Sequence, residues 1–259
     1  MSIGMRVYNC IVHELPSWVS NWSQDQWAHM IGHPSSIFQA SGGSLPKLVF
    51  MESQKSLKIE GLELDTVKRT SQVLNPSCFQ FDNRSCASMV DLWRRICENT
   101  QFTLASRYVN GVSAIEAFLD TITVCCEKTR PGLGPPKRFA DGLSYLARVL
   151  SHDPDVELSL ELLELANAGD PFHWNRCTSV ALNRRLARTA SGYYILGPKV
   201  MKPKDIICVL FGGKTLFCLR PKDDYYLLVG ECYVHGLMDG EAMDEMDHRQ
   251  VPKKWFHIR

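Results

Sequence analysis

The stretch VLFGGKTLFCLRPKDDYYLLVGECYVHGLMDGEAM, Val209 to Met243, is the most regularly patterned part of the chain. Two apolar, β-rich runs, IICVLF and TLFCLRP, meet at Gly212–Gly213, a dipeptide that favours a two-residue hairpin turn. A turn at Asp223–Asp224 then leads into a third run, YYLLVGECYV. The stretch therefore predicts three consecutive strands. The reactive and ionisable side chains in GECYVHGLMDGE require a separate interpretation.

A second zone of strands is predicted from Phe38 to about Ser71. It begins with IFQAS, turns at Gly42–Gly43 and continues into LVFMES and LKIEGLELDTVKRTS. In LKIEGLELD apolar and polar residues alternate with period two, which is typical of a half-buried strand. The alternation breaks at Gly61, so a bulge or a bend is expected there.

Helical spacing dominates from Ser85 to about Arg188. The run SAIEAFLDTITVCCE begins at Ser113 and carries Glu116 three residues later, which is a capping-box pattern. Asp153 before Pro154 predicts a further helix start.

Two more features close this helical zone. NRCTSVALNRRLARTASG predicts a last helix that stops at Gly192. KTRPGLGPPKR, residues 128–138, is too rich in proline and glycine for regular structure, and we expect a mobile surface loop there.

Strands, then helices, then strands predict an α+β fold rather than alternating βαβ units. We expect an antiparallel β-sheet or small barrel formed by the N- and C-terminal strands, with a central block of about five helices packed on it. The chain, residues 1–259, is interpreted as a single domain: an N-terminal segment and strands (1–71), a helical block (85–188) and β-hairpins (192–243).

Composition excludes several classes of function. A net charge of +1 with scattered lysines and arginines gives no footprint for nucleic acid. No apolar stretch approaches the roughly 20 residues of a membrane span, and the N-terminus lacks the apolar core of a signal peptide, so a cytoplasmic location is expected. The ten cysteines lie in apolar runs without a CxxC pair, which predicts reduced core thiols.

The familiar enzyme motifs GxSxG, HExxH, GxxxxGK[ST] and GxGxxG do not occur in the sequence. Hydrolase, kinase and dehydrogenase functions are therefore not expected, and no cofactor is predicted.

The run GECYVHGLMDGE contains several side chains that could act in catalysis or bind a metal. If it is a strand, Glu231 and Tyr233 point to one face and Cys232 to the other, which disfavours a nucleophilic pair of Cys232 with His235. His235 and Asp239 lack a clear third and fourth ligand in the sequence, so no metal site is predicted. The structural interpretation, a packed cysteine beside a hydrogen-bonded turn, stands beside the catalytic one.

Aromatic residues gather near the predicted junction of helices and sheet. Tryptophan and tyrosine combine a large apolar surface with one polar group, which suits the wall of a small-molecule pocket. We expect such a pocket to be lined by His173, Trp174, Tyr193 and Trp22, although for any one of them alone a place in the core or at its edge is the favoured interpretation.

Several stretches resemble the C-terminal half of fungal heterokaryon-incompatibility (HET) proteins. They are Arg184 to Pro221, the following YYLLVGECYVHGLMDGEA, and ELPSWVSNWS from Glu14 to Ser23, with FQASGG and LKIEGLELDTV fitting the same pattern. In family members these stretches are preceded by an N-terminal HET domain, which is similar to nucleotide-cleaving TIR-type domains. About a dozen residues precede LPSW here, so the resemblance implies a fungal stand-alone copy of the accessory half without the signalling activity.

Two functions stay open. In the first, slightly favoured, the chain is a cofactor-independent cyclase or isomerase, such as a pericyclase of the Diels–Alder type, acting on an apolar terpenoid or polyketide in fungal secondary metabolism. His235, Tyr233 and Glu231 would polarise the substrate, and a shaped cavity would hold it in a reactive conformation.

In the second, the chain is a non-catalytic binding or regulatory module related to incompatibility proteins. A homo-oligomer is compatible with either function. A closed apolar cavity of about 300 Å³ or more would favour the enzyme, and an exposed apolar patch would favour the module.

Overall fold

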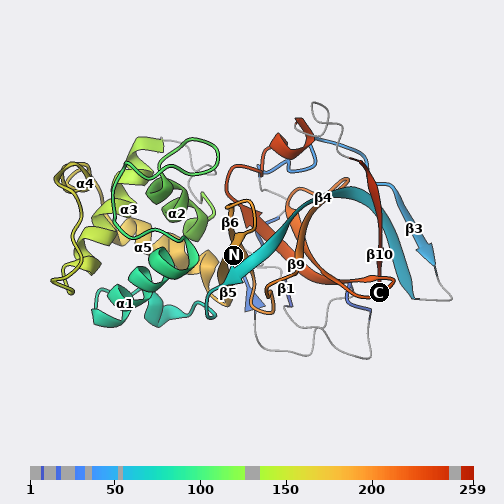
Figure 1. Cartoon of the computed structure of the whole chain (residues 1–259), viewed down its shortest axis with the longest axis horizontal. Coiled ribbons are helices and arrows are strands. Elements are labelled where there is room, and N and C mark those ends of the chain that lie inside the picture. The colour runs from blue at the N-terminus through green and yellow to red at the C-terminus, as the bar shows by residue number, and fades with distance from the viewer. Residues whose placement is uncertain are drawn as a thin grey trace, which may run out of the picture.

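The computed structural model describes residues 7–8, 16–18, 27–32, 37–51, 55–125, 135–244 and 252–259. Helices gather on one side of the molecule and strands form a ring on the other (Figure 1). The expected α+β architecture, with helices from the middle of the chain packed on strands from both ends, is confirmed.

The main sheet has eight strands and is antiparallel except where β10 meets β9. It consists of β3 (Leu48–Met51), β4 (Ser56–Thr70), β5 (Arg184–Thr189), β6 (Tyr194–Pro198), β7 (Ile206–Leu210), β8 (Leu216–Pro221), β9 (Tyr226–Val234) and β10 (Lys254–Ile258). A separate two-stranded sheet pairs β1 (Val7–Tyr8) with β2 (Trp27–Ala28).

The long strand β4 closes the main sheet into a barrel. Its C-terminal part pairs with β5, and the chain of neighbours continues through β6, β9 and β8 to β7. Its central part pairs with β7, which completes the circuit. Its N-terminal part pairs with β10 on one side and with β3 on the other. The small barrel predicted from the sequence is therefore present.

The break in alternation at Gly61 marks a close backbone contact. A Cβ atom there would lie 2.0 Å from the carbonyl oxygen of Val209 on β7, so no larger residue fits. The expected bulge follows slightly later, because the register with β7 shifts between Glu63 and Asp65. These irregularities let one strand bend around the barrel.

The three predicted C-terminal strands are β7, β8 and β9. The turn between the first two is longer than expected, since β7 ends at Leu210 and β8 begins at Leu216. The Gly213 N–H donates to the carbonyl oxygen of Leu210 at 2.9 Å. At the other end of the chain, IFQAS is no strand, because residues 40–43 form the turn around Gly42–Gly43.

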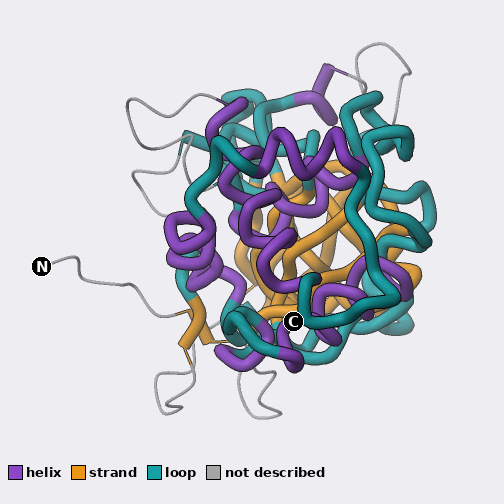
Figure 2. Tube along the Cα trace, turned by 90° about the vertical axis from the view of Figure 1, so that its left-hand side faces the viewer, coloured by secondary structure: helices purple, strands orange, loops and turns teal. Residues whose placement is uncertain are grey.

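Helices α1 to α5 cover the barrel on one side, as Figure 2 shows. They are α1 (Asn83–Asp91), α2 (Ala114–Thr123), α3 (Pro135–Leu150), α4 (Leu160–Ala166) and α5 (Pro171–Cys177), with the short 3-10 helices η2 (Pro76–Cys78) and η5 (Thr178–Ala181) and the π-helical segment η3 (Leu92–Ile96), which continues α1. Helix α2 packs against β6 and is buried at every position except Glu116. It joins the helical layer to the barrel.

Two predicted helix boundaries change. Ser113 is the residue before α2, as expected, but its side chain makes no capping hydrogen bond. The start predicted at Asp153–Pro154 is wrong: α4 begins at Leu160, and the Ser159 hydroxyl accepts a hydrogen bond from the Leu162 N–H at 3.4 Å.

The predicted last helix is also wrong beyond Ala181. Arg184–Thr189 is strand β5, which pairs with β4 on one side and β6 on the other, so sheet pairing overrides the helical spacing of this run. The helical block therefore ends before residue 188. In the predicted loop 128–138, Pro135–Arg138 form the first turn of α3, and residues 126–134 lie outside the described part.

No helix within the described ranges combines the length and the apolar character that a membrane crossing requires. Eight cysteines of the described part are buried, as expected for core residues: Cys78, Cys86, Cys97, Cys125, Cys177, Cys208, Cys218 and Cys232.

Candidate functional site

A buried polar cluster lies between the end of α2 and the end of β9. Five side chains form it, and we refer to them as the Tyr233 cluster: Asp120, Cys125, Arg138, Tyr233 and His235. They come from α2 and the residues after it, from α3, and from β9 and the turn that follows it. The cluster is therefore built where the helical layer meets the barrel.

The backbone at the end of α2 directs Cys125 toward this cluster. Val124 and Cys125 both adopt left-handed conformations, with φ of 56° and 47°, and such a conformation is unfavourable for a β-branched residue. The Cys125 N–H donates to the Asp120 carbonyl oxygen at 3.0 Å. The helix thus ends in a strained turn that holds the cysteine next to Asp120.

The Tyr233 hydroxyl connects two chemical groups. It lies 3.0 Å from Cys125 Sγ and 3.1 Å from His235 Nδ1. Because a hydroxyl has one proton and two lone pairs, it can donate to one neighbour and accept from the other. Burial, and then the nearby Cys125, raise the pKa of Tyr233 well above its ordinary value, so the phenol is neutral.

Arg138 supplies the positive charge of the cluster. Its Nε and Nη2 donate to the two carboxylate oxygens of Asp120 at 2.6 and 2.7 Å. Burial lowers the pKa of this guanidinium, but the charge of Asp120 and its hydrogen bonds raise it above the ordinary value, so Arg138 stays charged. The pair neutralises itself.

Tyr108 holds the turn after β9. Its hydroxyl donates to the carbonyl oxygen of His235 at 3.1 Å and accepts from the Tyr194 N–H at 2.9 Å. Its ring also contacts the ring of His235, with centroids 5.3 Å apart, and that of Tyr193, at 6.2 Å. The predicted pocket residue Tyr193 therefore lies one ring away from His235.

The third predicted catalytic residue, Glu231, makes its contacts elsewhere. Its carboxylate accepts from the N–H groups of Ile31 at 2.6 Å and Gly32 at 2.9 Å, and from Arg184 Nη2 at 3.0 Å. Arg184 Nη2 also donates to the carbonyl oxygen of His29 at 2.6 Å. Glu231 and Arg184 thus anchor residues 29–32 to the barrel.

His173 and Trp174 belong to a different neighbourhood, in α5. His173 Nδ1 lies 2.9 Å from an oxygen of Asp141 on α3. Burial raises the pKa of Asp141, but hydrogen bonds from Lys137, the Asp170 N–H and His173 bring it below the ordinary value. Trp174 is buried against Tyr145, with ring centroids 4.5 Å apart. Both lie within the helical layer, and Trp22 lies outside the described part.

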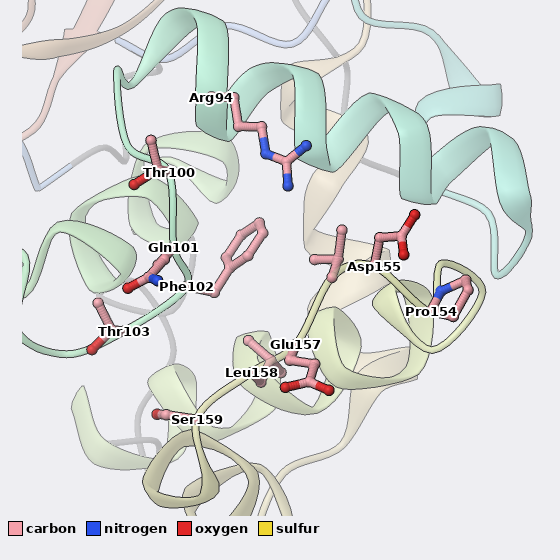
Figure 3. Close-up of a pocket in the computed structure, with 11 residues that line it drawn as sticks. Arg94, Thr100, Gln101, Phe102, Thr103, Pro154, Asp155, Glu157, Leu158 and Ser159 are labelled. Atoms are coloured by element: carbon pink, nitrogen blue, oxygen red, sulfur yellow. The ribbon is translucent and has the colours of Figure 1, made fainter.

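Among the pockets of the described surface are three that neither Tyr233 nor His235 lines. One of about 490 Å³ lies between residues 100–103 and residues 154–159. In Figure 3 the Arg94 side chain reaches from its helix toward Phe102 across this pocket. All three are open depressions rather than closed cavities, and the expected pocket formed by His173, Trp174 and Tyr193 is not among them.

Sequence reasoning missed Asp120, Cys125 and Arg138. Asp120 could have been found, because it is the one charged residue besides Glu116 in an otherwise apolar helix with a few threonines, and a buried charge needs a partner. Arg138 stood in a run interpreted as an irregular loop. Cys125 resembles any other cysteine in an apolar run, so only the three-dimensional structure distinguishes it.

Metal binding is within the chemical range of this cluster. Ligand atoms of Asp120, Cys125 and His235 all lie within 4.8 Å of one another, and all three residues are buried. The sequence offered only His235 as a ligand here, because its partners come from α2 and from the second residue after it, about a hundred positions earlier.

Comparison with known proteins agrees with the barrel. Residues 88–251, more than half of the chain, match the model of the Het-6 beta-barrel domain. A segment of 60 residues is 40% identical to heterokaryon incompatibility protein 6, OR allele, of Neurospora crassa. The segment covers 22% of this chain and 9% of that protein, so the match spans only a small part of the relative.

No solved structure matches the chain significantly. The resemblance to fungal incompatibility proteins is nevertheless supported by two independent comparisons. On the extent of the domain match, the chain belongs to the Het-6 β-barrel domain family.

Proposed function

We propose that this chain is a non-catalytic binding module of fungal heterokaryon incompatibility that associates with a second copy of itself through the edge of β3. The supporting observation is the exposure of three consecutive apolar residues on that strand. Leu48, Val49 and Phe50 are 54%, 51% and 53% exposed. In a half-buried strand alternate residues are covered, whereas β3 is about half exposed on both faces, and the Phe50 ring contacts Trp18 with centroids 5.8 Å apart.

The backbone of β3 also offers hydrogen bonds. Among the described strands it pairs only with β4, which leaves the groups on its outer edge available to another strand. Natural proteins protect such edges with charges, prolines or bulges, and Leu48–Met51 contains none of these. An added strand would complete the hydrogen bonding and cover the apolar side chains.

A second copy of this chain fits the edge for a reason of symmetry. Two β3 strands running antiparallel are related by a two-fold axis, so the same residues serve both sides of the interface. The strand carries no charge that would oppose its own copy. The relative of this chain is named for heterokaryon incompatibility and for one allele, and an allele-dependent contact between barrels is the activity we propose.

The experiment is light scattering on purified Val49→Glu protein, which we expect to be monomeric where the wild-type chain is dimeric. Within one chain a glutamate at this position faces Lys58 on β4, which the fold accommodates. In the dimer each such glutamate would lie against the apolar side chains of the other β3, where its charge loses contact with water. Leu45→Glu is the matched control, because Leu45 is 82% exposed and lies outside β3. A monomeric wild-type chain, or a control that also dissociates, would contradict the proposal.

A cofactor-independent cyclase or isomerase is the second candidate. It is favoured by the hydrogen bond between Tyr233 and His235, two of the three predicted donors. Its test is to incubate the purified chain with an extract of a strain that lacks the gene. Conversion of one accumulated compound into an isomer of identical mass, lost in Tyr233→Phe, would support catalysis, and an unchanged extract would exclude it for the metabolites present.

A further inference from the structure

We infer that Asp120, Cys125 and His235 form a zinc site that fastens α2 to the end of β9. The inference is independent of the proposed binding function. Three chemically different ligands from two distant parts of the chain meet here, with all ligand atoms within 4.8 Å of one another. Exposed carboxylates gather often without a metal, but these three groups are buried.

The donor set selects the metal. Thiolate and imidazole are ligands for zinc and related soft or borderline ions, whereas magnesium and calcium require oxygen ligands throughout. Zinc sites of four ligands with mixed sulfur, nitrogen and oxygen donors are common. One thiolate, one imidazole and one carboxylate therefore point to zinc.

The geometry requires only a small closing movement. Zinc–ligand bonds of about 2.0–2.3 Å place tetrahedral ligand atoms about 3.3–3.6 Å apart. The strained left-handed turn at Val124–Cys125 already directs the thiol into the cluster. Strain of this kind persists where surrounding structure or function fixes it, and a bound metal ion would be one such constraint.

The position of Tyr233 indicates the fourth ligand. Asp120 and a Cys125 thiolate would balance the two positive charges of zinc. The neutral Tyr233 hydroxyl lies 3.0 Å from Cys125 Sγ and 3.1 Å from His235 Nδ1, so its oxygen is placed to complete the four ligands. Arg138 holds Asp120 in position from outside the ligand set.

The test is a titration of metal-free protein with Co²⁺, which reports thiolate coordination by a charge-transfer band in the near ultraviolet, followed by displacement with Zn²⁺. We expect one Co²⁺ per chain, loss of the band in Cys125→Ser, and an affinity at least about tenfold lower in His235→Gln. Cys125→Ser keeps the size and hydrogen bonding of the side chain. Cys86→Ala, a buried cysteine on α1, is the matched control and should bind as the wild type does.

Two outcomes would overturn the site. In the first, the wild-type chain binds no Co²⁺ and its melting temperature does not change with Zn²⁺, which shows that the cluster is only hydrogen-bonded. In the second, the band survives in Cys125→Ser or disappears in Cys86→Ala, which places the metal on other cysteines. The wild-type titration decides the first outcome even if a variant does not fold.

Discussion

Two arginine–carboxylate pairs are buried among the residues that the structure describes, and they have different surroundings. Arg184–Glu231 is surrounded by backbone groups: the carboxylate accepts from two N–H groups, and the guanidinium donates to a carbonyl oxygen. Arg138–Asp120 is surrounded by the ionisable side chains of Cys125, Tyr233 and His235. The first pair holds chain segments together, whereas the second concentrates chemical groups.

The pKa values of the two arginines shift in opposite directions. Complete burial lowers the pKa of Arg184, and the charge of Glu231 offsets this only in part. In Arg138 the bidentate contact with Asp120 outweighs a smaller burial, and the pKa rises. An arginine–carboxylate contact therefore does not reveal its role by itself; its neighbours do.

Removing the anchor should have the largest effect. Glu231→Ala leaves Arg184 charged and without its carboxylate, and two N–H groups without an acceptor, so we expect a loss of about 3–5 kcal/mol in the free energy of unfolding. Urea denaturation measures it. Glu63→Ala is the matched control, because its pair with Lys254 is exposed and should contribute less than about 1 kcal/mol. Equal losses in both variants would remove the distinction.

Removing the charge of the second pair should cost less. Asp120→Asn keeps the shape of the side chain and one acceptor for Arg138, so we expect a loss of about 2–3 kcal/mol. The control is Asp91→Asn, whose partner Arg95 is exposed and which should lose at most about 0.5 kcal/mol. A near-neutral Asp120→Asn would show that Arg138 reaches solvent in solution.

Tyr233→Phe tests how much one hydroxyl beside the second pair contributes to stability. It deletes only the hydroxyl between Cys125 and His235 and leaves two buried groups short of a partner, for an expected loss of about 1–2 kcal/mol. Thermal unfolding checks the value. An unchanged free energy of unfolding would mean that the hydroxyl does not stabilise the fold.

The smallest expected effect is a pH dependence at the anchor. Partial burial, and then the nearby Arg184, lower the pKa of His29 from its ordinary value of 6.5. The unfolded chain therefore binds more protons than the folded one as the pH falls through this range, and stability decreases toward lower pH. His29→Asn should flatten the decrease in urea titrations between about pH 7 and pH 5. An identical slope in the variant would assign the dependence to other groups.

Much of the barrel was predictable from the sequence. The period-two alternation of β4 and the apolar runs of β7 to β9 depend on local burial, which side-chain patterns report directly. The strand β5 was not predictable, because RRLART has helical spacing and becomes a strand only through pairing with β4 and β6. Long-range pairing decides such segments.

The candidate site was predictable only in part. Tyr233 and His235 were found because they stand close together in the sequence and the strand brings both to the same cluster. Glu231 lies only two residues before Tyr233, yet its carboxylate is engaged by the backbone of residues 31 and 32. Cys125 and Asp120 join the cluster through the packing of α2 on the barrel, which no spacing in the sequence expresses.

The position of β10 has a consequence for the synthesis of this protein. Lys254–Ile258 pair with the N-terminal part of β4, which leaves the ribosome long before them, and Ile258 also pairs with Tyr226 on β9. During translation that part of β4 has β3 beside it but lacks its second neighbour until the last strand emerges. Nascent chains that stall before residue 254 would expose a second unpaired edge, so we expect them to depend on chaperones more than the finished chain does.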